Sequence, residues 1–456
     1  MRQFTVKQIC EKIWDLENKY DLLNWEIQEV KPWHLLRMTI YYQITQRVGI
    51  FHESSDESKP SRINKLKIYF QIIVYSVLKN PLWGSYRKNI LIFEHSRKVF
   101  VKGKYIDIYS QYLIDGLKPD EYEIIEEPFL HKHLSKNKHN RKYMEYFQAY
   151  TFIQRKLAKI KFSDTETSFI SQIESEINRF FDIRLDLKDM IYQGILDFKF
   201  RYQFFSKLIK KRKPKQIYVV VAYFKMPLIA AAKANNVPVI EIQHGTMSRY
   251  HLGYSFPNQS ELDYFPDIFY AFGDYWPEAV KFPVSKDKII NYGFPYLTNR
   301  IGEFNDIGKK EKQIIFISQA VIGKDLSKIA YELAVKSKDY HIIFKLHPEE
   351  YERWKNEYHE LVLASKLQNF EVADNNQKNL YSYFAESEFQ IGVFSTAIYE
   401  GLAFNCKTIL YNLPGIEYMQ YLQEKGIVAI VNNLQELGGA LISFKPASFN
   451  REYFFK

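Results

Sequence analysis

Apolar residues recur at three- and four-residue spacing from residue 1 to about residue 84, and this spacing is typical of amphipathic helices. The pattern breaks at 81–85, where Pro81 and Gly84 interrupt it. We therefore expect a helical N-terminal extension over residues 1–85. Its most apolar run, 68–78, is far shorter than the roughly 20 residues that span a bilayer. We predict a core helix there and no transmembrane segment.

The next segments switch to the pattern of an α/β domain. A short apolar run at 89–93 predicts a buried strand, and polar residues follow it at once, beginning with Glu94 and His95. Residues 143–208 predict long amphipathic helices. A strand, a helix and a second strand are then expected at 217–222, 227–234 and 237–242, an order that favours a parallel sheet.

A charged stretch with two glycines, 301–312, separates this half from a second one with the same kind of pattern. We interpret it as a linker. In the second half, strands are expected at 313–317, 341–346, 389–394 and 408–411, with helices at 326–337 and starting near 348 and 396. We thus predict an extension at 1–85, a first α/β domain at 86–304 and a second at 305–456, with a cleft between the two domains.

Composition excludes several classes of protein. A chain of 456 residues with 46% hydrophobic content can bury two cores, which argues against disorder. Two distant cysteines, Cys10 and Cys406, form neither a disulfide framework nor a zinc motif. The first 20 residues mix charged and apolar residues, unlike a secretory signal. We expect a cytoplasmic protein.

The net charge of +10 admits nucleic acid, an anionic membrane or an anionic substrate as a partner. Basic residues gather at 59–67, 132–142 and 207–215, but no RNA-binding, zinc-finger or helix-turn-helix motif surrounds them. We therefore expect no nucleic-acid partner. A solvated basic face, in peripheral contact with anionic lipid or polysaccharide, fits better.

The second half carries two candidate phosphate sites, each where a strand gives way to a helix. In FKLHP, His347 ends a strand and Pro348 stands at the first helical position, so free N–H groups and the imidazole could face a phosphate. In GVFSTAIYEG, Ser395 and Thr396 precede a helix, and Glu400 lies one turn further along, within reach of a ribose diol. The alternatives are a capping histidine and an ordinary Ser/Thr cap with a surface glutamate. Two such sites about fifty residues apart indicate one nucleotide pocket.

Three further segments end strands in the same way. The run EIQHG places His244 at a strand end beside a glycine, although a core or turn histidine is an equal alternative. Ser318 and Gln319 end the first strand of the second half and could line the cleft. The run GFPY, 293–296, could do so as well, or could simply form a turn.

FKLHP and GVFSTAIYEGLAF resemble the His-Pro and Ser-Thr motifs of bacterial capsule and lipopolysaccharide glycosyltransferases that use CMP-activated acidic sugars, the sialyltransferases and Kdo transferases. The motifs are also similar to those of CDP-glycerol glycerophosphotransferases. The run IEIQHG, continuing through HLGYSFP, FGDYW and GFPYL, resembles the first group more closely. The resemblance covers about 217–417. It implies a GT-B fold, in which two Rossmann-like α/β domains face a cleft.

The same resemblance implies roles for particular residues. His347, Ser395 and Thr396 would bind the phosphate of the cytidine nucleotide. The catalytic acid or base would lie in the first half, where no family motif aligns; Glu94, His95, Asp107 and Asp115 are candidates by placement, and His244 would face the cleft. No Asp-x-Asp pair at a strand end offers a metal clamp, so we expect a metal-independent mechanism with no cofactor besides the CMP-sugar donor.

We therefore expect a glycosyltransferase of bacterial surface polysaccharide synthesis, which transfers Kdo or sialic acid from a CMP-activated donor to an oligosaccharide or glycolipid acceptor. It would work in the cytoplasm or on the inner face of the cytoplasmic membrane. A CDP-glycerol glycerophosphotransferase is the alternative enzyme. A non-catalytic glycan- or lipid-binding subunit of an export machine is the alternative of another class.

Overall fold

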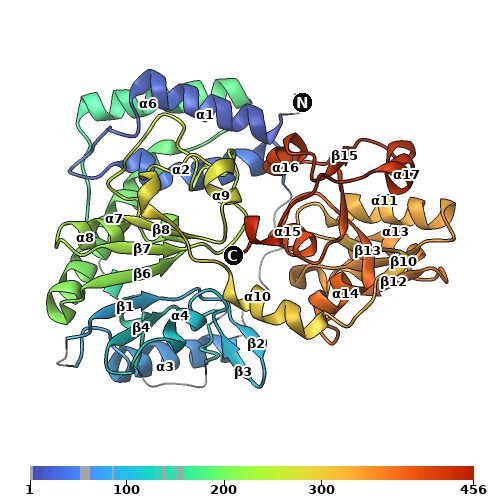
Figure 1. Cartoon of the computed structure of the whole chain (residues 1–456). Helices are drawn as coiled ribbons and strands as arrows, with labels where there is room; N and C mark the ends of the chain where they lie inside the picture. The colour runs from blue at the N-terminus through green and yellow to red at the C-terminus, as the bar shows by residue number, and fades with distance from the viewer. Residues whose placement is uncertain are drawn as a thin grey trace.

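The computed structural model describes residues 4–51, 62–84, 87–129, 131–135, 140–147, 150–151 and 158–456. Figure 1 shows two lobes, each built around a parallel sheet with helices packed on it, and N-terminal helices that lie over the first lobe. The predicted α/β class with two parallel-sheet domains and a helical N-terminal region is therefore confirmed.

The N-terminal helices α1 (Val6–Tyr20) and α2 (Pro32–Arg47) belong to the packing of the first lobe. A capping box between Thr5 and Gln8 starts α1. A buried ion pair of 2.6 Å between Glu17 of α1 and Arg37 of α2 joins the two helices, and Arg37 also donates to the carbonyl of Ser255. α2 in turn packs on α7 (Leu187–Arg212). The extension is thus tied to the sheet domain by polar as well as apolar contacts.

Helix α3 (Arg62–Leu78) corrects the prediction of a core helix at 68–78. The helix forms, but Tyr69, Phe70 and Ile73 are 63%, 69% and 64% exposed. Only the opposite face packs on the lobe, where Tyr75 contacts the ring of Tyr143. A run of apolar residues predicts a helix without showing which of its faces has a partner. Among the described residues, no helix is long and apolar enough to cross a membrane.

The first sheet is entirely parallel and has the order β5-β4-β1-β6-β7-β8-β9. Its strands are β1 (Ile90–Phe93), β4 (Tyr122–Glu126), β5 (Arg141–Tyr143), β6 (Gln216–Val220), β7 (Val239–Ile242), β8 (Ile268–Ala271) and β9 (Ile289–Asn291). The chain runs outward from β1 in one direction and returns through β6 in the other. The point between β1 and β6 is therefore a topological switch point, where the crevice of a doubly wound sheet opens.

The first lobe also contains α4 (Gln111–Asp115), α6 (Asp164–Phe181), α7, α8 (Met226–Lys233), α9 (Tyr275–Ala279) and α10 (Pro295–Ile301), with a hairpin of β2 (Val99–Val101) and β3 (Lys104–Ile106). The predicted strand–helix–strand unit is confirmed as β6, α8 and β7. The expectation of helices over 143–208 is partly confirmed, since residues 145–147 and 150–151 are helical before α6 and α7. It is wrong at Tyr143, which ends β5, and at 158–163, which precede the start of α6. Residues 148–149 and 152–157 lie outside the described part.

The second sheet is also parallel, with the order β12-β11-β10-β13-β14-β15. Its strands are β10 (Lys310–Ile317), β11 (His341–Lys345), β12 (Phe370–Ala373), β13 (Ser387–Gly392), β14 (Lys407–Tyr411) and β15 (Ala429–Val431). Its switch point lies between β10 and β13. The predicted linker at 301–312 is shorter than expected, since α10 ends at its first residue and β10 already pairs at Lys310.

Helices α11 (Gly323–Lys336), α12 (Trp354–Glu357), α13 (His359–Ala364), α14 (Leu380–Glu386), α15 (Thr396–Ala403), α16 (Gln420–Glu424) and α17 (Leu434–Ser443) complete the second lobe. Short 3₁₀ turns are η1 (Ala222–Phe224), η2 (Lys286–Lys288), η3 (Gly302–Phe304), η4 (Pro348–Glu350), η5 (Ile416–Met419) and η6 (Arg451–Tyr453). The helix expected from 348 is thus a single 3₁₀ turn followed by short helices.

After α17 the C-terminal segment returns to the first lobe. The N–H of Lys456 donates to the carbonyl of Phe272 at 2.8 Å, and the indole of Trp276 donates to the carbonyl of Phe454 at 2.9 Å. Gly273 lets this segment approach, because a Cβ there would stand 2.6 Å from the carbonyl oxygen of Tyr453. The two lobes are therefore joined both by the connection before β10 and by the end of the chain.

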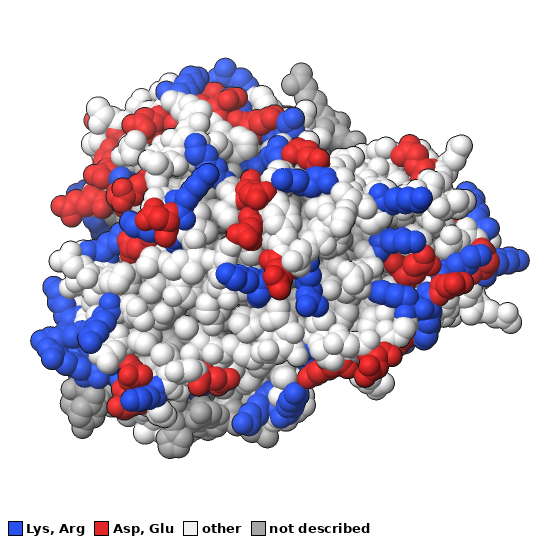
Figure 2. All heavy atoms as spheres, in the orientation of Figure 1, with Lys and Arg blue, Asp and Glu red and all other residues white. Residues whose placement is uncertain are grey.

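On the face shown in Figure 2, Lys and Arg side chains gather at the lower left, Asp and Glu gather above them, and elsewhere both kinds are mixed. The positive net charge is therefore not spread evenly over this view. A partner that responds to charge would have to recognise a local group of basic residues.

Candidate functional site

A cavity opens at the switch point of each sheet. In the first lobe a cavity of about 520 Å³ is lined by Glu94, His95 and Ser96, which follow β1, and by the segment from Val220 to Pro227, which follows β6. At the switch point of the second sheet a cavity of about 370 Å³ is lined by Gln319 and Val321 after β10 and by Phe394, Ser395 and Thr396 after β13. The first lobe closes it with Thr246, Ser248 and His251. Of the residues predicted as sites, Glu94, His95 and His244 line the first cavity and Gln319, Ser395 and Thr396 line the second. Switch points are where doubly wound sheets commonly bind ligands.

The two lobes meet at these cavities. The backbone N–H of Thr246, just past His244, donates to the Thr396 hydroxyl at 3.0 Å, and the two threonine hydroxyls lie 3.2 Å apart. Gly245 is packed against the same hydroxyl, since a Cβ there would lie 3.2 Å from it. The IEIQHG and FST segments, about 150 residues apart in sequence, therefore touch across the cleft.

His95 and His244 lie together at the first cavity. Their rings are stacked with centroids 6.3 Å apart, and each is partly buried. Burial lowers the pKa of both imidazoles, and for His244 the neighbouring His95 and His251 add to the effect. Both side chains are therefore neutral near pH 7, the form that can accept a proton.

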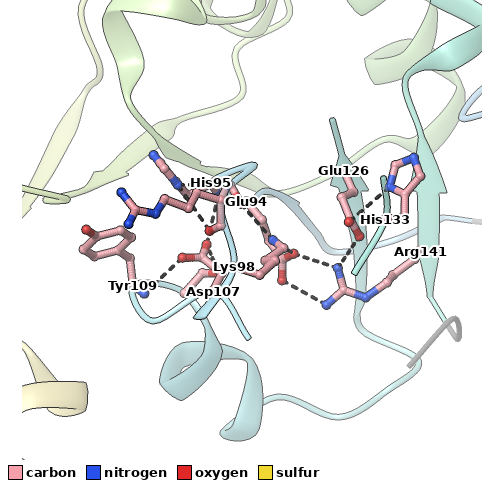
Figure 3. Close-up of polar contacts among 10 residues, drawn as sticks. Glu94, His95, Lys98, Asp107, Tyr109, Glu126, His133 and Arg141 are labelled. Carbon is pink, nitrogen blue, oxygen red and sulfur yellow. Dashed lines mark hydrogen bonds and ion pairs between the residues drawn. The ribbon is translucent and has the colours of Figure 1, made fainter. Parts of the chain in front are cut away.

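Glu94 lines the same cavity, but its carboxylate is paired with cations in the interior of the lobe. Its carboxylate pairs with Lys98 at 2.5 Å and with Arg141 at 2.6 Å, and Arg141 bridges onward to Glu126 at 2.9 Å. Figure 3 shows Arg141 between the two glutamates, with His133 beyond Glu126. Burial alone would raise the pKa of Glu94, but the two cations outweigh it and lower the pKa. This ionised carboxylate anchors the loop that carries His95.

Asp107 has a similar anchoring geometry. It is buried, and it accepts from the backbone N–H of His95 at 3.0 Å and from the Ser110 hydroxyl at 2.7 Å (Figure 3). Burial raises its pKa. Asp115, in contrast, is exposed at the end of α4 and lines a different cavity, so the structure does not bring it to the cleft.

The sequence reasoning missed Glu241, the acid inside the buried strand β7. Its carboxyl accepts from the N–H of Ala222 at 3.0 Å and from the Tyr254 hydroxyl, whose oxygen also lies 3.4 Å from Nδ1 of His244. Burial raises the pKa of Glu241 to about 8. It pins the turn after β6, where Val221 has φ 64°, a strained value for a β-branched residue. The feature of the sequence that could have indicated Glu241 is a single acidic residue inside an otherwise apolar strand.

His347 has the capping geometry named as the alternative. Nδ1 accepts from the N–H of Glu349 at 3.4 Å across η4, and Pro348 is exposed. The buried Glu350 accepts from the N–H of His347 at 2.6 Å. With Nδ1 used as an acceptor, the ring proton lies on Nε2, so one imidazole N–H stays available for a ligand oxygen.

Ser318 and Gln319 separate in the structure. Ser318 is buried and donates to Glu350 at 2.9 Å, so it supports the turn that carries His347. Gln319 lines the second cavity, and its buried Oε1 has no hydrogen-bond partner among the described residues. An unpaired buried amide oxygen is costly, which is typical of a group that a ligand completes.

Ser395 caps α15 by accepting from the N–H of Ala397 at 3.1 Å. Glu400, one turn further on, accepts from the Tyr381 hydroxyl at 3.2 Å. Burial raises its pKa to about 7. Gly401 lets α15 pack on β13, because a Cβ there would stand 2.1 Å from the side-chain oxygen of Gln390. This arrangement of Ser395 and Glu400 therefore fits both interpretations given above, an ordinary helix cap and a nucleotide site.

The N-terminal extension forms part of the second cavity, which sequence reasoning did not anticipate. Tyr42, Thr45 and Gln46 of α2 line it, and the ring of Phe51 lies 5.9 Å from that of Phe394. The sequence could not indicate that α2 lines a cavity, because the helical spacing of its aromatic residues fits core packing equally well. Among the described residues, no group of three or more His, Cys, Asp or Glu side chains could hold a metal ion.

No family model and no curated protein matches the sequence. Among solved structures, the chain is similar to UDP-GlcNAc 2-epimerase from Methanocaldococcus jannaschii (TM-score 0.46, 12% identity, 80% of this chain and 95% of that one). It is also similar to Acinetobacter baumannii MurG (0.42, 12%, 80% and 92%) and to the glycotransferase of kitacinnamycin (0.45, 11%, 78% and 90%). What the structure itself shows is two lobes, each built on a parallel sheet. Likenesses of this degree do not decide between the activities named for these proteins.

Proposed function

We propose that this protein is a nucleotide-sugar-dependent glycosyltransferase whose donor and acceptor meet at the contact between the two lobes. The observation that carries the proposal is the placement of a cavity at each switch point, with Thr246 of one lobe bonded to Thr396 of the other. A reaction between two bound substrates needs such an arrangement, because each lobe can hold one reactant beside the other.

The second lobe would hold the nucleotide. Its cavity combines the start of α15, the free amide oxygen of Gln319 and the hydroxyls of Ser395 and Thr396. The N-terminal end of an eight-residue helix favours a phosphate. His347, which ends the neighbouring strand β11, would donate from Nε2 to the same phosphate, and Glu400 would accept from the ribose hydroxyls.

The first lobe would hold the acceptor. Its cavity is polar: the Lys225–Glu127 pair at 2.7 Å and the Arg201–Asp197 pair at 2.6 Å both lie among its lining residues. Polar side chains at a cavity wall suit a sugar, whose hydroxyls need donors and acceptors.

His244 is the candidate general base, with His95 beside it. In the proposed step the acceptor hydroxyl attacks the anomeric carbon, its proton passes to the neutral imidazole, and the bond to the nucleotide phosphate breaks with the electron pair on the leaving phosphate. Glu94 and Asp107 would act through the loop that holds His95. This assigns to the predicted carboxylates a positioning role.

The finer proposal is a CMP-activated acidic sugar, Kdo or sialic acid, added to a surface polysaccharide. It rests on the resemblance of FKLHP and GVFSTAIYEGLAF to the transferases that use such donors. The alternative within the same site is glycerol phosphate from CDP-glycerol.

Two linked assays test the function. Thermal shift with CMP, CDP, UDP and GDP should show stabilisation by the cognate nucleotide alone, about 2.7 kcal/mol at a hundredfold excess over Kd. Nucleotide release from CMP-Kdo, CMP-sialic acid, CDP-glycerol and UDP-GlcNAc, with and without a glycan acceptor, should then identify a CMP-sugar.

The outcomes separate the alternatives. Release from a UDP-sugar would keep the transferase and overturn the CMP donor. Conversion of the donor without nucleotide release would replace transfer with sugar modification. Glycan binding without turnover of any donor would favour the non-catalytic subunit. Release that continues in excess EDTA would support metal independence, and its loss and rescue by magnesium would contradict it.

A further inference from the structure

Helix α3 carries an apolar stripe on its outer side. Tyr69, Phe70, Ile73 and Val77 are 63%, 69%, 64% and 48% exposed. At 100° per residue these four positions span about 100° of the helix circumference. Single exposed apolar residues are ordinary on a protein surface, but four large ones on one helical face mark a contact surface.

The loop that follows α3 carries a further exposed apolar side chain, Trp83, which is 53% exposed. The buried guanidinium of Arg212 donates to the carbonyls of Pro81, Trp83 and Gly84 and is itself paired with Glu123 at 2.8 Å. The backbone around Trp83 is therefore fixed, and its ring is presented outward on a rigid support. Trp favours the boundary between water and the acyl region of a membrane.

Basic residues surround this loop. Lys211 donates to the carbonyl of Leu82, Lys142 comes near Gly84, and Lys79 lies over the ring of Tyr143 at 5.9 Å. Burial lowers the pKa of Lys142, and the charges of Arg212, Lys79 and Lys211 contribute to the effect, which places these cations together. Helix α3 itself contains no Asp or Glu, and Lys67 is exposed on it.

We propose that the face of α3 formed by Tyr69, Phe70, Ile73 and Val77, together with Trp83, lies in the interface of an anionic membrane. The apolar side chains would enter the boundary between headgroups and acyl chains, while Lys67, Lys79, Lys142 and Lys211 contact the anionic headgroups. The geometry is that of a helix lying in the plane of the membrane. It draws on none of the cleft residues, so it stands independently of the proposed function.

This surface also accounts for three stretches of the sequence that the cleft leaves unused. The basic stretches 132–142 and 207–215 contribute Lys142 and Lys211 to it, and the apolar run 68–78 supplies its stripe. Apolar area with adjacent positive charge is complementary to an anionic lipid surface, whereas a second copy of the chain would present the same positive charge.

Flotation of the full chain with lipid vesicles tests the proposal. We expect binding to vesicles of phosphatidylcholine with phosphatidylglycerol, weak binding to pure phosphatidylcholine, and loss of binding as salt rises. Phe70→Ser with Ile73→Ser should lower partitioning by about tenfold or more, because two apolar insertions are lost. Lys67→Glu should weaken only the binding to anionic vesicles.

Matched controls lie in the second lobe. Ile442→Ser changes an 86% exposed apolar residue of α17, and Lys338→Glu reverses an exposed charge; neither should alter flotation. Circular dichroism and thermal melting confirm that every variant folds. Absence of vesicle binding by the unaltered protein, or equal binding by the α3 variants, would overturn the proposal. Concentration-dependent dimerisation that the α3 variants abolish, without vesicle binding, would show that a second copy covers this face instead.

Discussion

The Thr396 hydroxyl accepts the backbone N–H of Thr246 at 3.0 Å, and this bond joins the start of α15 in one lobe to the loop after β7 in the other. The same hydroxyl is the group expected to face the donor phosphate. A bound nucleotide would therefore compete for it or share it with Thr246. If the donor binds as proposed, closure of the lobes and occupation of the donor site would be coupled at this atom.

The first prediction concerns this coupling. Thr396→Val keeps the shape of the side chain and removes the hydroxyl, so nucleotide affinity should fall by about tenfold, close to 1.4 kcal/mol. Thr246→Val removes only a hydroxyl and leaves the backbone N–H, so its affinity should stay within about twofold of the unaltered protein. Calorimetric titration of both variants provides the measurement. Equal losses in the two would mean that the lobe contact, and not the phosphate, accounts for the effect.

The second prediction separates the two roles of His347. His347→Ala removes both the cap on the N–H of Glu349 and the donor at Nε2, and it should reduce donor turnover by roughly 1.5 to 3 kcal/mol. His347→Asn keeps a side-chain acceptor for the cap. If Asn restores the melting temperature but not the turnover, the imidazole binds ligand; full recovery of turnover by Asn would leave His347 only a capping role.

The third prediction uses the titration of Glu400. In the folded protein the pKa of Glu400 is about 7, above the usual value of a glutamate, because burial favours the protonated form. As the pH rises through 7 the carboxyl group ionises, and the stability gained from the protonated form is lost. An ionised carboxylate accepts better from ribose hydroxyls. Affinity for CMP relative to 2′-deoxy-CMP should therefore increase between pH 6 and 8.

Glu400→Gln should remove this pH dependence and lower CMP affinity by roughly tenfold. Glu332→Gln, at an exposed position of α11, is the control. The nucleotide's own titration affects the unaltered protein and the variants equally, so it does not change the comparison. Discrimination between the two nucleotides that is unchanged in Glu400→Gln would show that Glu400 does not contact the ribose.

The fourth prediction concerns how α15 is held on the sheet. Gly401→Ala places a Cβ 2.1 Å from the buried amide of Gln390 and should destabilise the protein by about 1 to 3 kcal/mol. Gly438→Ala, in α17, meets no atom within 4 Å and should stabilise by about 0.5 to 1 kcal/mol, since Gly is a poor helix residue. Chemical unfolding of the pair measures both. Equal unfolding free energies would contradict the packing described for α15.

Much of this fold could be predicted from sequence because parallel strands buried on both faces are nearly continuous apolar runs. β1, β6, β7, β10, β11, β13 and β14 were all expected from such runs. The edge strands β5 and β9 could not be found, since they are three residues long and carry polar residues. The exposure of α3 was also hidden, because burial depends on partners far away in sequence.

The candidate site was predictable in place and less so in detail. Strand ends gave His244, His347, Ser395 and Thr396, because the chemistry of a doubly wound sheet lies at one edge. Sequence could not show that Ser318 supports Glu350 or that Arg141 holds Glu94, since these pairs join distant segments. The contribution of α2 to the second cavity is a tertiary contact of the same kind.

Hydrogen exchange with and without the cognate nucleotide tests the central claim most directly. The account predicts added protection in the second lobe, at the start of α15 and in the turn after β11, together with protection of the loop that contains Thr246. Nucleotide that stabilises the protein while protecting only the cavity beside His95 and His244 would contradict the assignment of the donor to the second lobe.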